Sequence, residues 1–101
     1  MRMILTTAAL AAFWWTALFG ADAVAGKAVY NKSCKNCHGV DGTPSAGMVK
    51  AMNIKDFKTT EFSEADIKAA VTSGKGKMKP MPGVTGASLD NVVAYVQSLK
   101  Q

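Results

Sequence analysis

The chain opens with an apolar run and only later takes up a mixed pattern of hydrophobic and polar positions. Arg2 is followed by uncharged, mostly apolar residues from Met3 to Phe19, and then by Ala21-Asp22-Ala23-Val24-Ala25. A positive start, an apolar stretch and an A-x-A site are typical of a secretory signal peptide. We therefore expect a leader of residues 1–23, cleaved between about residues 21 and 25, and one domain of residues 24–101. The alternative is an uncleaved membrane anchor, although ~17 apolar residues are at the lower limit for a span.

Beyond this run the hydrophobic residues recur at helical spacing. The clearest stripe predicts a helix from Ser88 or Leu89 to Leu99. Ser63-Glu64-Ala65-Asp66 resembles a capping box and predicts a helix that ends at Gly74. Weaker patterns predict a helix over about residues 23–33 and a short, irregular one over about residues 48–57. The mature chain is therefore expected to be all-α.

Two segments rich in glycine, proline and lysine separate these helices. Residues 39–47 and 75–86 are predicted to be loops. Within the first predicted helix, Gly26 and Tyr30 are four residues apart and so share one face. A glycine inside a helix costs about 1 kcal/mol relative to alanine. We therefore expect a packing reason for Gly26, such as the close approach of another helix.

The stretch Cys34-Lys35-Asn36-Cys37-His38 contains both cysteines and the only histidine of the chain. C-x-x-C-H is the signature of covalent c-type haem attachment. The two thiols are spaced to form thioether bonds with the two vinyl groups of one haem. His38 then lies beneath the iron as an axial ligand.

Three other interpretations of these residues compete with haem attachment. A thioredoxin-like redox pair requires a βαβ pattern, which this sequence lacks. A structural zinc site normally needs four protein ligands, and the chain offers three good ones. A disulfide between Cys34 and Cys37 would close a strained two-residue loop that adds little stability.

The size of the mature chain also favours a buried cofactor. Cleavage leaves about 76 to 78 residues, and a domain of this size usually needs a staple beyond its apolar core. Both tryptophans lie in the leader, so two tyrosines and two phenylalanines remain. A haem is a large, flat apolar group, and its burial would complete a core that so few aromatic side chains cannot fill.

With these segments placed, the chain resembles a small bacterial class I cytochrome c over nearly all of its mature region. The resemblance implies three to four short helices around one covalent haem c and its iron. It also implies that Gly26 and Tyr30 of the first helix pack against Tyr95 of the last, which would supply the packing reason for Gly26. The early position of the haem motif distinguishes this class from the four-helix, high-spin cytochromes, whose motif lies near the C-terminus.

The resemblance implies a methionine as the sixth ligand of the iron. A single histidine excludes bis-histidine ligation within one chain, which leaves methionine, lysine, water or an empty position. Met48 and Met52, four apart on a predicted helix, are interpreted as packing residues. Met78 and Met81 lie in the loop where the family keeps its ligand, and the spacing of seventeen residues to Tyr95 favours Met78, with Met81 as the alternative.

The proximal histidine requires a hydrogen-bond partner of its own. A ligating histidine usually donates its second ring N–H to a carbonyl or carboxylate. Pro44, six residues after His38, resembles the family's proline whose carbonyl accepts this proton. An ordinary loop proline is the alternative.

The charge of the chain indicates the kind of partner. The net charge is +5, and every cation after the leader is a lysine. The absence of arginine argues against nucleic acid, where bidentate base contacts favour that residue. A lysine-rich face suits an acidic redox protein instead. The lysines near the haem motif and the methionine loop are Lys32, Lys35, Lys75, Lys77 and Lys79.

The sequence thus predicts a monomeric, single-haem electron carrier in the periplasm, which is not an enzyme and has no membrane contact after cleavage. A neutral thioether favours ferrous iron, and a filled sixth position blocks substrate binding. An obligate cytochrome subunit of a periplasmic dehydrogenase or oxidase needs the same site and stays as the alternative. A haem peroxidase is disfavoured, because the mature chain has no second histidine and no arginine to serve as a distal acid.

Overall fold

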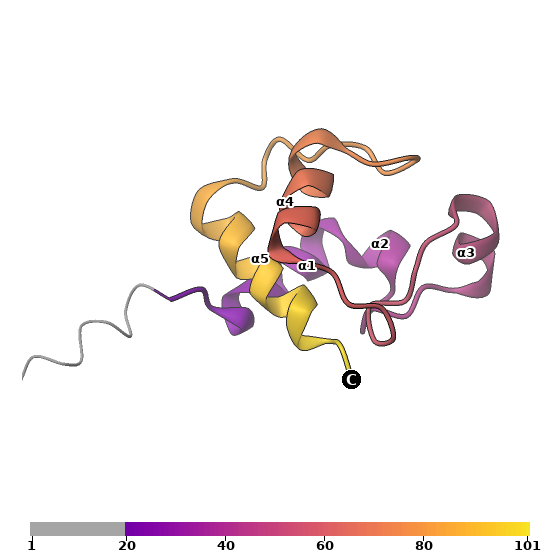
Figure 1. The fold of residues 1–101 in the computed structure, drawn as a ribbon, viewed down its shortest axis with the longest axis horizontal. Coiled ribbons are helices and arrows are strands. Elements are labelled where there is room, and N and C mark those ends of the chain that lie inside the picture. The colour runs from indigo at the N-terminus through magenta and orange to yellow at the C-terminus, as the bar shows by residue number, and fades with distance from the viewer. Residues whose placement is uncertain (1–19) are drawn as a thin grey trace, which may run out of the picture.

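The computed structural model describes residues 20–101, so most of the predicted leader lies outside the described residues. Five helices follow one another, and residues 20–101 form no strand, only an isolated bridge between Lys75 and Met78 (Figure 1). The helices are α1 (Ala23–Ser33), α2 (Lys35–His38), α3 (Ala46–Met52), α4 (Glu64–Ser73) and α5 (Gly86–Ser98). The all-α prediction is confirmed, with five helices instead of three to four because the C-x-x-C-H motif forms a turn of helix of its own. No helix in this range is long and apolar enough to cross a bilayer.

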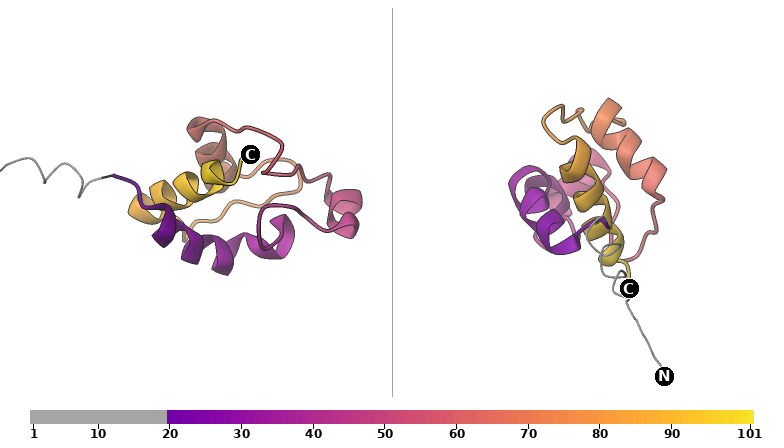
Figure 2. Two further views of the ribbon diagram at one scale, coloured as in Figure 1. Left: turned by 90° about the horizontal axis from the view of Figure 1, so that it is seen from below. Right: turned by 90° about the vertical axis from the view of Figure 1, so that its left-hand side faces the viewer.

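The two terminal helices, α1 and α5, pack against each other, as Figure 2 shows. Gly26 is buried, and a Cβ atom at this position would overlap the carbonyl oxygen of Asn91 and lie 3.0 Å from the Cβ of Tyr95. The Tyr30 ring is fully buried, and its centroid lies 5.1 Å from that of Tyr95. The predicted packing of Gly26 and Tyr30 against the last helix is therefore confirmed.

Helix α4 completes the packed half of the molecule. The Ser63 hydroxyl accepts the N–H of Asp66 at 3.0 Å, so the predicted start of this helix is confirmed. Lys68 forms ion pairs with Glu64 at 2.7 Å and with Asp90 of α5 at 3.0 Å. The buried core between α1, α4 and α5 consists of Tyr30, Ile67, Val71, Val84, Val92, Val93 and Val96.

Helix α3 differs in extent and setting from the prediction. It starts at residue 46, because the Ser45 hydroxyl caps it by accepting the N–H of Met48 at 3.3 Å. It ends at Met52, and the next residue, Asn53, has a left-handed backbone (φ 54°) that caps the last turn. No residue of α3 is buried, and Figure 1 shows this helix at the far end of the molecule from α5. The position of α3 is therefore set mainly by the segments on either side of it. Its own side chains make few contacts with the rest of the described chain.

Candidate haem site

The haem motif follows α1 without a break. The N–H of Cys34 bonds to the carbonyl oxygen of Tyr30 at 2.8 Å, which ends α1, and α2 then carries Cys37 and His38. Both thiols are half-buried and free. Burial raises the pKa of the Cys34 thiol to about 11, with a smaller contribution from Cys37. Both side chains are therefore open to covalent attachment, and Cys34 is held as the neutral thiol.

His38 lies in a setting that suits a metal ligand. Burial lowers the pKa of its imidazole, which favours the neutral form that can bind a metal. Its Nδ1 atom is buried and makes no hydrogen bond to any described residue. The ring stacks on Phe57, with centroids 4.6 Å apart and ring planes 16° apart. Phe57 was not predicted to be part of the site, since the sequence placed it only at the end of a short, irregular helix and gave no signal that this segment folds back onto His38.

The segment after His38 turns back over the motif. Gly39 has φ 87°, and a Cβ atom there would overlap the carbonyl of Thr43 and lie 3.3 Å from the Pro44 nitrogen. The backbone at Thr43 and Pro44 therefore lies close against Gly39, which places the buried Pro44 beside the haem motif. The Pro44 carbonyl does not accept a bond from Nδ1 of His38 in this structure. That hydrogen bond stays a prediction, and the orphaned Nδ1 is the donor it requires.

A second hydrogen bond fixes the same turn from the core. The Tyr30 hydroxyl donates to the carbonyl oxygen of Gly39 at 2.6 Å. Burial raises the pKa of Tyr30, so the hydroxyl keeps its proton well above neutral pH. The helical spacing of Tyr30 predicted its burial but gave no signal of this bond. Tyr30 thus links the α1–α5 interface directly to Gly39, the residue after His38.

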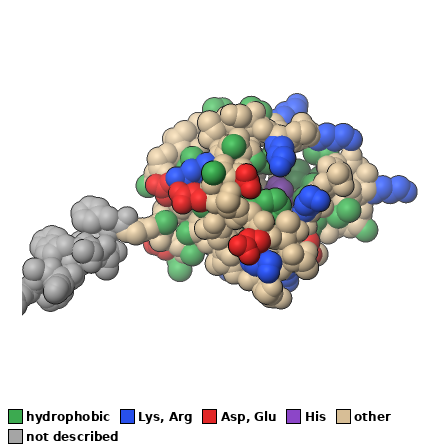
Figure 3. All heavy atoms as spheres, in the orientation of Figure 1, with side chains coloured by type: hydrophobic (Ala, Val, Ile, Leu, Met, Phe, Trp, Pro, Cys, Tyr) green, Lys and Arg blue, Asp and Glu red, His purple; other side chains and the backbone are tan. Residues whose placement is uncertain are grey.

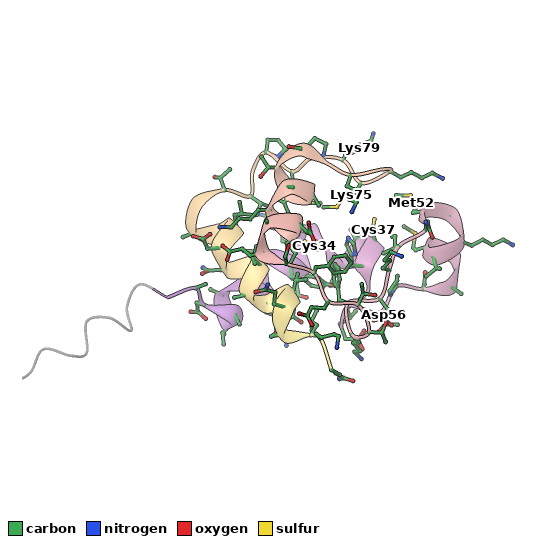
Figure 4. The ribbon with its side chains drawn as sticks, viewed as in Figure 1. Cys34, Cys37, Met52, Asp56, Lys75 and Lys79 are labelled. Carbon is green, nitrogen blue, oxygen red and sulfur yellow. The ribbon has the colours of Figure 1, made fainter. Side chains whose placement is uncertain are left out.

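A hollow opens above His38. Figure 3 shows the single histidine at its floor, apolar side chains on its walls and lysines around its rim. Figure 4, in the same orientation, shows the elements around it: Cys37 on α2, Met52 on α3, and Lys75 and Lys79 on the loop between α4 and α5. Met78 and Met81, in that same loop, are half-buried and pack against the core. The structure therefore brings both candidate ligands onto the loop that borders the hollow and leaves the choice between them open.

These residues fit a covalent haem. Two free thiols, a neutral histidine with a spare ring proton, a hollow with apolar walls and the unburied helix α3 are what such a group would engage. Cys34 and Cys37 would hold it covalently and His38 would bind its iron, which supplies a reversible one-electron change. The two cysteines are free, and residues 20–101 bring together no group of three or more His, Cys, Asp or Glu side chains that could hold a metal ion.

A separate cavity of about 360 Å³ lies between residues 60–62 and α5. Phe62, Ile67 and Val96 are its apolar lining residues, and Glu61 and Lys100 line it as well. None of the predicted site residues lines it. The chemistry of the chain is therefore concentrated at the hollow above His38.

Fold and site together define a c-type cytochrome with a single haem. The sequence pattern of the family described as "Cytochrome C oxidase, cbb3-type, subunit III" matches residues 21–96, and the chain belongs to this family. Cytochrome c-554(547) of Halothiobacillus neapolitanus is 32% identical over 89 residues, which cover 78% of this chain and 98% of that protein. Membership gives the chain a covalent haem c with its iron and a role in electron transfer.

Two solved structures resemble the fold. The KustC0563 c-type cytochrome superposes with a TM-score of 0.64 and 26% identity, covering 75% of this chain and 98% of that one. A chain of the Kuenenia stuttgartiensis reducing HAO-like protein complex Kustc0457/Kustc0458 superposes with a TM-score of 0.59 and 23% identity. The match covers 75% of this chain but only 41% of that chain. The second likeness concerns the fold alone.

Proposed function

We propose that the protein is a diffusible electron carrier outside the cytoplasm that exchanges electrons through the lysine-rimmed hollow with acidic redox partners. The observation that carries this proposal is the position of His38 at the floor of an open hollow with lysines on its rim (Figure 3). An exposed cofactor edge shortens the path for an electron, and the positive rim attracts a negatively charged partner. C-type cytochromes are typically extracytoplasmic, which agrees with the leader predicted from the sequence.

The proposed site consists of five positions. Cys34 and Cys37 attach the haem, His38 is the proximal ligand, and the Pro44 carbonyl accepts the proton of its Nδ1. Met78 is the sixth ligand, with Met81 as the alternative. Support for Met78 comes from its spacing to Tyr95 and from its place in the loop that borders the hollow.

The ligand assignment is tested by paired substitutions in the purified holoprotein. Met78→Ala should abolish the weak long-wavelength absorption band that accompanies iron–thioether bonding, and Met81→Ala should leave it in place. Retention of the band in Met78→Ala and its loss in Met81→Ala would transfer the ligand to Met81. The fold would be unaffected by that result.

The docking face is tested by the salt dependence of electron exchange. Stopped-flow oxidation by an acidic redox protein should slow as ionic strength rises, because the Debye length falls to about 10 Å at 0.1 M salt. The loss should lie in the association rate. Lys75→Glu with Lys79→Glu should reproduce the high-salt rate without changing the haem spectrum. Lys27→Glu with Lys100→Glu makes the same change in net charge outside the proposed docking lysines and should have a smaller effect.

A rate that is flat or rises with salt would remove the lysines from the docking face. The alternative function, a fixed subunit of a larger redox assembly, finds a parallel in the multi-protein complex that contains one of the similar structures. Purification from native cells separates the two, since a carrier should elute as a free monomer. Co-elution with a partner at high salt would favour the subunit.

A further inference from the structure

The segment that carries α3 is a loop closed at its base. At this base the N–H of Phe57 bonds to the carbonyl of Gly42 at 2.9 Å, and the Thr43 hydroxyl donates to the Asp56 carboxylate at 3.1 Å. Asp41 and Lys58 form an ion pair at 2.6 Å beside them. We call residues 43–56 the α3 loop. A compact excursion with close ends and its own short helix has the form of an Ω-loop.

Beyond its base, a single hydrogen bond ties the α3 loop to the rest of the described chain. The ammonium group of Lys77 donates a hydrogen bond to the carbonyl oxygen of Ala51 at 2.8 Å. It is the only hydrogen bond between residues 44–55 and the remainder of the described chain. Ala51 lies in the last turn of α3, where carbonyls have no partner within the helix and the helix dipole favours a cation. The bond therefore joins α3 to the α4–α5 loop across the hollow.

The position of Lys77 follows from a tight turn. Lys75 and Met78 exchange backbone hydrogen bonds at 3.0 and 2.9 Å, which leaves Gly76 and Lys77 as the two turn residues. Gly76 has φ 59°, the sign that a type II′ turn requires at its first central position. At the base of the turn, a Cβ atom on Gly74 would lie 2.8 Å from the Met78 carbonyl. Lys77 is thus presented from a short, well-defined turn next to Met78.

We propose that Lys77 is a positioning residue that holds α3 across the mouth of the hollow and so limits the access of small ligands to the iron. This proposal rests on the proposed site and removes Lys77 from the docking lysines predicted from the sequence. Lys75 and Lys79, two residues to either side, make no side-chain hydrogen bond to any described residue. The same basic segment therefore contains one lysine committed to the fold and two that are free for a partner.

The proposal is tested in the holoprotein by substitutions that keep the aliphatic stem and remove the donor. Lys77→Met is compared with Lys79→Met, which makes the same chemical change without breaking the bond, and with Lys77→Arg, which can restore it. The first readout is amide hydrogen exchange of the peptide that contains α3, followed by mass spectrometry. The second is the affinity of the ferric protein for imidazole.

Lys77→Met should speed exchange in α3 and raise imidazole affinity, each by about threefold to tenfold, the range set by the net value of one hydrogen bond. Lys79→Met should change neither quantity, and Lys77→Arg should restore both. Equal effects of the two methionine variants would overturn the proposal. So would a rise in imidazole affinity without faster exchange in α3. Both readouts are independent of electron transfer to a partner, so they decide this point even if the docking proposal fails.

Discussion

Helices α1 and α3 each contain a glycine in their first half, yet only the glycine of α1 is enclosed by another helix. A side chain at Gly26 would run into the backbone of α5, whereas one at Gly47 would meet nothing within 4 Å. The difference extends to whole regions. The α1–α5 interface is close-packed by the chain itself, while the α3 loop buries none of its helix and depends on its base and Lys77. The protein thus completes one half of its core and leaves the other half to the haem.

Removal of the haem should have the largest effect on the difference in stability between the α1–α5 interface and the α3 loop. A Cys34→Ala, Cys37→Ala chain lacks both attachment points, and a folded unit as small as residues 23–101 rarely forms a stable core without a staple. Circular dichroism should show loss of most helix and of cooperative unfolding. Residual protection in hydrogen exchange should lie in α1 and α5, not in α3. Cooperative unfolding of the haem-free variant, with α3 protected from exchange, would show that α3 does not depend on the haem for its stability.

Gly26→Ala should be the most damaging single substitution outside the haem ligands. The added methyl overlaps the Asn91 carbonyl, which is rigid helical backbone, so α1 and α5 must move apart. We expect the free energy of unfolding of the holoprotein to fall by about 3 kcal/mol, the upper part of the range for overpacking. Denaturant titration measures this loss. A change below about 1 kcal/mol would show that the two helices yield easily.

Tyr30→Phe should weaken the link between the core and the haem motif. The Gly39 carbonyl loses its donor, at a cost of about 1 kcal/mol. Because burial raises the pKa of Tyr30, its hydroxyl contributes stability that is lost as pH rises above about 10, where the unfolded chain ionises. The variant should therefore lose less stability than the natural protein above that pH. Tyr95→Phe is the matched control, since the Tyr95 hydroxyl has no hydrogen bond among residues 20–101.

Gly47→Ala should act in the opposite direction to Gly26→Ala. Open space surrounds this position, so the alanine adds helix propensity without a clash. Stability should rise, as measured in the same denaturant titration, but by less than the about 0.5–1 kcal/mol of a mid-helix glycine, because Gly47 lies in the first turn of α3. A loss of stability would mean that, in the holoprotein, another group contacts α3 at Gly47, where the protein chain leaves open space.

The smallest effect is expected at the base of the α3 loop. A hydrogen bond from Lys58 lowers the pKa of Asp41, and the same bond raises the pKa of Lys58. The carboxylate contributes stability above its ordinary pKa, and that contribution is lost as pH falls below about 4. Asp41→Asn should lower the melting temperature slightly at neutral pH, because exposed ion pairs are weak. The melting curves of the two proteins should converge in acid, and a difference that persists there would exclude this pair as its cause.

Local patterns predicted the packed half of the molecule well. The span of α1, the start and end of α4 and the contact of Gly26 and Tyr30 with α5 followed from spacing, capping and resemblance, and the structure confirms them. The haem motif was equally plain, because it is contiguous. The contacts that arrange the hollow were missed: Phe57 against His38, Tyr30 to Gly39 and Lys77 to Ala51. Each joins residues from different segments, and no periodicity records which loops fold back on one another.

The pairing of α1 with α5 also bears on the order in which the protein is made. α1 and the C-x-x-C-H motif are synthesised before Asn91 and Tyr95, against which Gly26 packs. Contacts between the two ends of a chain form only after the intervening loop has closed. Until α5 has been synthesised, therefore, α1 lacks its packing partner and the two thiols that follow it stay unenclosed. The attachment site stays accessible until α5 exists, so covalent modification and completion of the α1–α5 interface are ordered by position along the sequence.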